Sequence, residues 1–289
     1  MASRQQIKRR IGSVKSTKQI TRAMQLVAAS KLRRAQEAVL RPRAYSELAR
    51  QILTRLRQLA ADDSTYRLFT PRDVKRRLLI VITSDRGLAG AYDANIIRQM
   101  LNEVATDRAA GIKTSVICIG RKAAHAASRI TGLDVQAVYN EMPDQPTADV
   151  IRPILTSVVG LFADQEVDAV DIICTHFVST VNQNVAVQRL LPAGFDEVDL
   201  PSDIATAEIE PSAEELIRAT ALRLLEVQIY QALLDAIASE QSMRMLAMKN
   251  ATDNATDLID DLTLAYNNAR QAAITQELAE ITGGAEALK

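Results

Sequence analysis

Aromatic residues are scarce in this sequence, and tryptophan is absent. Six tyrosines and four phenylalanines are the only aromatic residues among 289. Aromatic rings supply much of the area buried in ordinary globular cores. The shortage indicates that much of the chain does not build such a core.

The residue types that usually form metal sites or act as nucleophiles are also few. Cys118 and Cys174 lie in apolar, strand-like runs, so we expect small buried hydrophobes in a reducing compartment, without a disulfide. His125 and His176 have no cysteine or carboxylate at metal-ligand spacing. Ser84 with Asp85 is interpreted as a turn and helix-cap pair. The sequence therefore predicts no catalytic residue, no metal site and no cofactor.

Long hydrophobic runs are missing as well. The longest aliphatic run is "LLIVI" at 78–82, far too short to cross a bilayer. The basic N-terminal stretch has no apolar segment behind it, so we expect no signal peptide. The sequence predicts a soluble protein, or one peripheral to a membrane.

Charge is balanced in total but unevenly distributed. The chain has 35 basic and 35 acidic residues, yet residues 1–43 contain twelve basic residues and one acid, Glu37. Residues 196–215 contain eight acids and no base. Separate docking surfaces are expected at these two places. The basic stretch is interpreted first as a solvated face, then as a groove for an acidic protein, and last as a nucleic-acid site, because it lacks interleaved aromatics.

Both ends of the chain have helical patterns. Residues 3–58 carry apolar residues at three- and four-residue steps, and Pro42 should kink or briefly interrupt this helix. A second helix is predicted between Ser212, which begins a capping box with Glu215, and the stop signal Gly283–Gly284. A helix of that length spans about 105 Å and must project from any globular domain.

A heptad pattern in the second helix predicts its partner. The expected seam consists of Met248, Ala251, Ala255, Leu258, Leu262, Ala265, Ala269 and Ala272. We expect an antiparallel two-helix coiled coil formed by the N- and C-terminal helices. The N-terminal helix is shorter, so the tip, which includes "TLAYNNARQAAITQEL" (263–278), should lack this partner. Its alanine, asparagine, glutamine and threonine side chains suit a surface that touches another protein without adhering permanently.

The middle of the chain predicts a central α/β, Rossmann-like domain with a mainly parallel sheet. Strands are expected at 76–83, 113–120, 133–139, 168–180 and 184–192, with helices at 91–109, after 120 and at 147–164. "SDRGLAG" (84–90) follows the first strand but lacks the third glycine of GxGxxG and the Gly-Lys-Ser/Thr ending of a phosphate loop, so we interpret it as a tight turn. The expected division is 1–59, 76–193 and 212–283, with connections between.

Three stretches resemble the gamma subunit of the F-type ATP synthase, the central rotor stalk. They are "IKRRIGSVKSTKQITRAMQLVAASKLRRAQ" (7–36), "ITSDRGLAGAYDANI" (82–96) and "MRMLAMKNATDNATDLIDDLTLAYNNARQAAITQELAEITGGAEAL" (243–288). The resemblance implies a rotor coiled coil inside an alpha3beta3 hexamer, whose foot meets the epsilon subunit and the c ring of Fo. It implies coupling of proton-driven rotation to ATP synthesis, regulation of ATPase activity and proton flow, and no catalysis by the chain itself.

The resemblance also implies residue roles. Met24 in "TRAMQ" matches the shaft position that faces the beta-subunit lever. Arg270, Gln271 and Thr275 match positions that touch a beta-subunit loop. Glu208 and Ile209, in the stretch 206–210, match the area that rests on the c ring. The initiator methionine and the lack of a transit peptide favour a bacterial protein at the cytoplasmic side of the cell inner membrane, with no nucleic-acid partner.

Two alternatives remain open at the level of the sequence. One is a coiled-coil nucleic-acid-binding protein, suggested by the basic N-terminal stretch. The other is a small α/β nucleotide enzyme, suggested by the position of the glycine-containing turn.

Overall fold

A computed structural model describes residues 4–60, 67–194, 201–205, 210 and 213–286 of the chain. The chain folds into two compact units. One is formed from Met1–Ala28 and Arg244–Lys289, and the other from Ala29–Met243. No helix in the described ranges is both long and apolar enough to span a bilayer.

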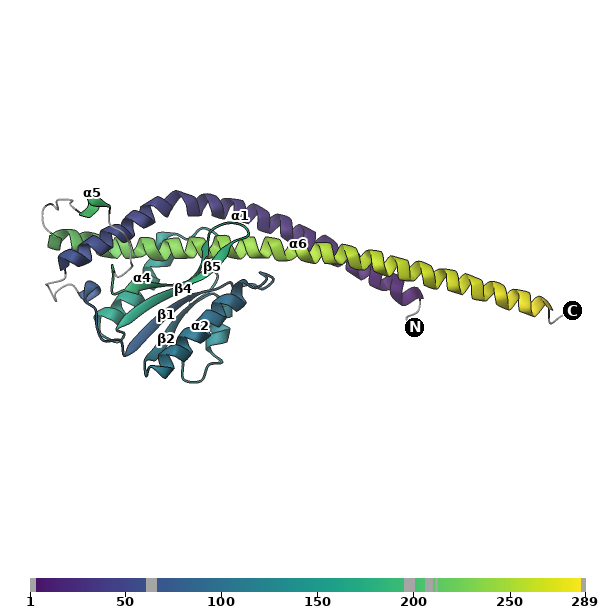
Figure 1. Ribbon diagram of the computed structural model, residues 1–289, viewed down its shortest axis with the longest axis horizontal. Helices are drawn as coiled ribbons and strands as arrows, with labels where there is room; N and C mark the ends of the chain where they lie inside the picture. The colour runs from purple at the N-terminus through teal and green to yellow at the C-terminus, as the bar shows by residue number, and fades with distance from the viewer. Residues whose placement is uncertain (1–3, 61–66, 195–200, 206–209, 211–212, 287–289) are drawn as a thin grey trace. The chain divides into compact units, whose positions relative to one another are not determined.

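The first unit pairs the beginning of α1 (Arg4–Ala60) with the end of α6 (Ala213–Glu286). Both chain ends lie at the same end of this pair in Figure 1, so the two helices are antiparallel. Side-chain burial in α1 recurs at alternating four- and three-residue steps, namely at 7, 11, 14, 18, 21, 25 and 28. This spacing is that of a coiled-coil seam. The predicted antiparallel coiled coil is confirmed.

The seam of α6 differs from the prediction in every second position. Met248, Ala255, Leu262 and Ala269 lie on it as predicted, and Ala251 is half-buried. Leu258, Ala265 and Ala272 are exposed, and the other seam positions are Thr252, Ile259, Tyr266 and Ala273. A search for apolar residues alone misses Thr252, whose hydroxyl lies 2.8 Å from that of Thr21 across the seam. This hydrogen bond satisfies two polar groups that would otherwise be costly to bury.

Helix boundaries also differ from two expectations. Helix α6 continues through Gly283–Gly284 to Glu286, so the predicted stop is wrong. Glycine in a helix costs about 1 kcal/mol relative to alanine, which weakens the last turn without ending it. Helix α1 passes through Pro42 without a break. The expected cap residue Ser212 lies outside the described residues.

The end of α6 extends past the N-terminal end of α1, as Figure 1 shows. Every side chain from Ile274 to Thr282 is exposed. The tip without this partner is therefore confirmed only from Ile274 onward, because the seam positions Tyr266, Ala269 and Ala273 fall within the predicted stretch 263–278. The tip is also not only polar. Ile274, Leu278 and Ile281 are exposed by 47%, 58% and 68%, and their spacing places them on one helix face.

The second unit contains a five-stranded sheet in the order β3-β2-β1-β4-β5. Its strands are β1 (Arg76–Ile82), β2 (Lys113–Ile119), β3 (Asp134–Tyr139), β4 (Ala169–Phe177) and β5 (Gln183–Leu191). The first four are mutually parallel, and β5 pairs antiparallel with β4. The mainly parallel sheet and its terminal strand pair are thus confirmed.

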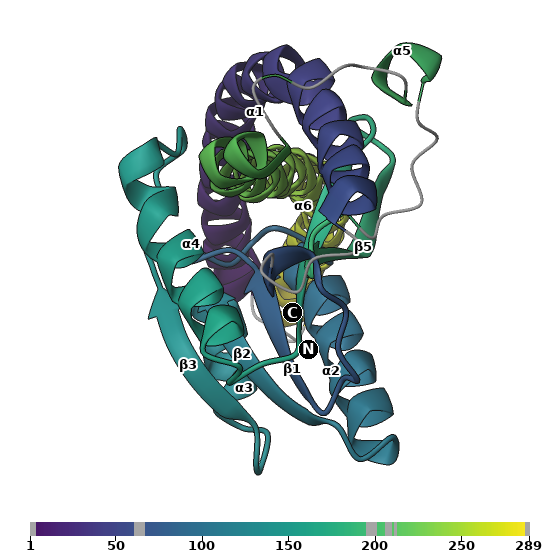
Figure 2. The ribbon, with the colours of Figure 1, turned by 90° about the vertical axis from the view of Figure 1, so that its left-hand side faces the viewer.

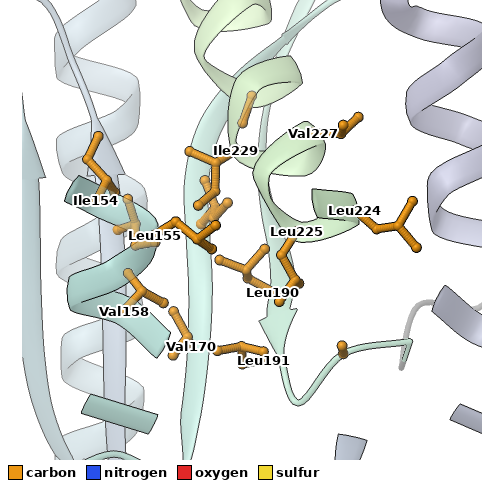
Figure 3. Packing of buried hydrophobic residues seen from close by; sticks show 14 of the residues in the cluster. Ile154, Leu155, Val158, Val170, Leu190, Leu191, Leu224, Leu225, Val227 and Ile229 are labelled. Atoms are coloured by element: carbon orange, nitrogen blue, oxygen red, sulfur yellow. The ribbon is translucent and has the colours of Figure 1, made fainter. Parts of the chain in front are cut away.

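Helices cover both faces of the sheet. Leu79 and Val81 point to the face covered by α2 (Tyr92–Ala109) and α3 (Arg121–Ala127). Their alternate neighbours Leu78 and Ile80 point to the other face, which is covered by α4 (Ala148–Ala163), α1 and α6. Figure 3 shows side chains of α4, β4, β5 and α6 meeting there. A continuous apolar strand such as β1 is typical of burial on both faces.

Helix α6 is deeply buried at its base. Between Leu224 and Ser242 most of its side chains are buried, because α1 lies beside it (Figure 2) and the sheet and α4 pack against it. The second unit therefore holds the base of both long helices in one hydrophobic core.

Two short helices were not predicted, η1 (Arg67–Phe69) and α5 (Ser202–Ala205).

Candidate interaction surfaces

An exposed apolar face on α1 surrounds the predicted site residue Met24. Met24 itself is half-buried. Ile20, Leu26 and Val27 are exposed by 60%, 58% and 58%. Residues 20, 24 and 27 lie on one side of a helix, and that side flanks the coiled-coil seam, with Met24 nearest to it. We name Ile20, Met24 and Val27 the α1 outer face; Leu26 is exposed on another side of the helix.

The three predicted residues near the end of α6 are all exposed. In the register set by Thr21 and Thr252, Arg270, Gln271 and Thr275 lie at or just beyond the N-terminal end of α1. The Thr275 hydroxyl donates a hydrogen bond to the backbone oxygen of Gln271, at 3.0 Å. Arg270 makes no hydrogen bond or ion pair with any residue that the structure describes. Its guanidinium is therefore available to a partner.

The structure does not bring all the predicted site residues together. The bond between Thr21 and Thr252 sets the register of the antiparallel pair. In that register Met24 lies opposite the region near residue 249, about 30 Å along the axis from Arg270. They form two contact regions. Glu208 and Ile209 lie outside the described residues.

The turn after β1 uses its own polar groups internally. Both Asp85 carboxylate oxygens accept backbone hydrogen bonds, from Arg121 at 3.1 Å and Glu141 at 2.8 Å. The Ser84 hydroxyl donates to Asp93 at 2.7 Å. The interpretation of Ser84 and Asp85 as turn and cap residues agrees with these contacts, because the Ser84 hydroxyl also lies 2.7 Å from the backbone oxygen of Arg86 and Arg121 is the first residue of α3.

A close backbone approach fixes the neighbouring turn. Gly120 has a φ of +97°, and a Cβ there would lie 2.3 Å from the Thr83 carbonyl oxygen. No larger residue fits this position. The carboxyl edge of the sheet is thus built for tight packing.

The histidines and cysteines have structural surroundings. His176 Nδ1 lies 3.0 Å from Oδ2 of Asp235, which is buried in α6, and exposed His125 lies next to Arg129. Cys118 and Cys174 are fully buried, as predicted, and burial raises the pKa of their thiols to about 11 and about 12. Within the described ranges, no group of three or more His, Cys, Asp or Glu is placed to hold a metal ion.

A charged cluster that the sequence analysis missed lies where β1 begins. Arg77 contacts Glu103 at 2.8 Å and Asp107 at 3.0 Å, and also bonds the buried Asp171. Arg189 pairs with the same Asp171 from β5. Burial alone would lower the pKa of the Arg77 guanidinium, but the charge of Asp171 and the bond to Glu103 outweigh it, so the pKa is raised. The sequence of β1, two arginines followed by five apolar residues, offered no signal for partners so distant in sequence.

A row of polar side chains on α6 also bonds the sheet. Ser239 donates to the backbone oxygen of Thr175 at 3.3 Å, and Ser242 donates to that of Thr180 at 2.9 Å. Asp235 holds His176 one turn earlier. Positions 235, 239 and 242 share one helix face. This polar row fixes the rotation of α6 against β4, which hydrophobic packing alone specifies less sharply.

Known proteins match the chain along its whole length. A sequence model of the ATP synthase family matches residues 3–288. The ATP synthase gamma chain of Heliobacterium modesticaldum is 41% identical over 295 residues, with all of both chains covered. The ATP synthase gamma chain of Chloroflexus aurantiacus is 41% identical over 290 residues, which cover 100% of this chain and 99% of the relative.

Chains in two solved ATP synthase structures are similar to this one. A chain of the Tetrahymena thermophila mitochondrial ATP synthase central stalk and c ring has 26% identity and a TM-score of 0.60, over 80% of this chain and 99% of that one. A chain of the Euglena gracilis mitochondrial ATP synthase, at 21% identity, shares the fold with a TM-score of 0.72 over 98% of this chain and 93% of that one.

The paired terminal helices, the α/β unit at their base and these matches define a class, the central-stalk subunits of rotary ATP synthases. Within that class, the chain belongs to the ATP synthase gamma-chain family.

Proposed function

We propose that this chain couples rotation of a membrane c ring to conformational cycling in the catalytic beta subunits, and that it performs no catalysis itself. The observation that carries the proposal is the asymmetric surface of the first unit. On α1 an apolar outer face is exposed, whereas the side of α6 opposite its seam carries the exposed acids Asp253, Asp257 and Asp260.

Such a surface can make different contacts at different angles of rotation. A partner that surrounds the paired helices meets the apolar side or the acidic side, depending on the angle of rotation. Each catalytic subunit then opens or closes according to the side it meets, because conformational coupling requires a difference in contact free energy between states.

We assign the contacts as the resemblance implies. Met24, with its apolar neighbours, faces the beta-subunit lever, and Arg270, Gln271 and Thr275 touch a beta-subunit loop nearer the tip. Segments 1–59 and 212–283 form the rotor, and segment 76–193 forms the α/β domain. The partners are the alpha3beta3 hexamer, the epsilon subunit and the c ring, which Glu208 and Ile209 approach, on the cytoplasmic side of a bacterial inner membrane.

Met24→Lys tests this assignment. The added charge disturbs the apolar outer face and attracts acidic side chains of the lever, so we expect fewer protons pumped per ATP hydrolysed in vesicles that contain the assembled complex. Gln19→Lys is the matched control, because it adds the same charge to an exposed position on another side of α1. An unchanged coupling ratio in Met24→Lys, or an equal loss in both variants, would contradict the contact assigned to Met24.

A further inference from the structure

A cavity of about 270 Å³ lies in the second unit, between α1, the segment after β3 and α6. It is unrelated to the outer surfaces described above. Its polar lining comes from Lys31 and Arg34 of α1, Asp144 and Gln145 of the segment after β3, and Gln241 of α6. Three segments that are distant in the sequence therefore contribute to one small polar space.

The lining is rich in hydrogen-bond donors. Lys31 and Arg34 are three residues apart on one face of α1, and both side chains are cationic. Gln241 is only 5% exposed, and its amide has no hydrogen-bond partner among the described residues. Arg34 is exposed and likewise has no partner in the described part of the chain, so its guanidinium and the Gln241 amide are left for a ligand.

The carboxylate of Asp144, which belongs to the chain itself, shows which kind of ligand fits the cavity. Asp144 Oδ2 lies 2.8 Å from Lys31 Nζ, and the Asp144 side chain remains 53% exposed. An oxyanion is thus already accommodated beside Lys31. Because Asp144 is half-exposed, its carboxylate can be hydrated when another anion takes its place. The cavity is smaller than most sites for drug-sized ligands, so the ligand must be small.

We propose that this cavity binds a small oxyanion, a phosphate or a compact carboxylate. Arg34 and Lys31 provide the charge, the Gln241 amide donates a further hydrogen bond, and Asp144 is the internal anion that competes for Lys31. A bound anion then ties α1 and α6 to the segment after β3 by charge-assisted hydrogen bonds.

Isothermal titration of the full-length chain tests the proposal, with inorganic phosphate and malonate as the two anions. We expect millimolar or tighter binding of at least one. Arg34→Gln should weaken it about tenfold, because a charge-assisted hydrogen bond is lost. Asp144→Asn should strengthen it several-fold, because the competing negative charge is removed. Gln241→Leu should weaken binding without removing a charge.

Arg33→Gln is the matched control, since its side chain is 85% exposed on the adjacent position of α1 and does not line the cavity. It should leave the affinity unchanged. Stronger binding of phosphate than malonate, or the reverse, identifies the ligand class. Absence of binding by both anions, equal losses in Arg34→Gln and Arg33→Gln, or weaker binding in Asp144→Asn would each overturn the proposal. These results do not depend on the rotor function, because they use the chain without its partners.

Discussion

At the scale of single residues, Arg77 holds together four elements of the second unit. Its guanidinium joins β1 to Glu103 and Asp107 of α2 and to Asp171 of β4, and Arg189 of β5 shares Asp171. The cluster contains three carboxylates and two guanidinium groups in a mostly buried place. Charges buried in this way are tolerated only while every member keeps its partners.

Arg77→Met should therefore destabilise the second unit by about 3–5 kcal/mol, because three carboxylates lose their shared cation. Urea unfolding followed by circular dichroism measures the change. Arg98→Met is the control, since Arg98 is exposed on α2 and has no partner in the described residues; it should change stability by less than about 0.5 kcal/mol. Similar unfolding midpoints for the two variants would show that the cluster contributes nothing.

The buried thiols predict a pH dependence of stability. The pKa of Cys118 rises from 9.0 to about 11 and that of Cys174 from 9.0 to about 12 on folding. Above about pH 9 the unfolded chain releases these protons while the folded chain keeps them, so stability falls as pH rises through this window. A Cys118→Ala/Cys174→Ala variant should lose less stability between pH 8 and pH 10.5 than the unchanged chain, measured by urea unfolding. Parallel curves for the two proteins would contradict this account.

At the scale of elements, strands were easier to predict than contacts between helices. The apolar run at 78–82 could only be a strand buried on both faces, and its bounds agree with β1 within one residue. The set of α6 residues that face α1 was harder to predict. It depends on Thr21, which is more than two hundred residues away in the sequence, and a polar residue carries no hydrophobic signal. Separation in the sequence, by 36 to 59 residues, likewise hides the bonds of Asp85 and Asp235.

A pair of neighbouring substitutions tests the seam. Ile259 lies on it, whereas Leu258 is 39% exposed beside it. Ile259→Asp should accelerate amide hydrogen exchange in residues 244–269 markedly, because a charge enters the helix interface. Leu258→Asp should have little effect. Faster exchange in Leu258→Asp than in Ile259→Asp would show that Leu258 lies on the seam, as the sequence alone predicted, and Ile259 does not.

At the scale of the whole molecule, the sequence predicted the class of protein better than its contact surfaces. Two long terminal helices and a central α/β segment follow from local patterns, and the resemblance adds the function. The exposed aliphatic face at Ile274, Leu278 and Ile281 was missed, because alanines and amides dominate that stretch. The cavity at Arg34 was also missed, since it forms only when three distant segments meet.

The central claim is that this chain turns as a rotor within catalytic partners. Ala110→Cys places an exposed thiol just after α2, and the native thiols are buried, so a bead can be attached there selectively. The bead is observed after the catalytic partners are immobilised and ATP is added. We predict sustained rotation in one direction that stops when ATP is removed. A bead that stays still while the complex hydrolyses ATP at its normal rate would contradict the account.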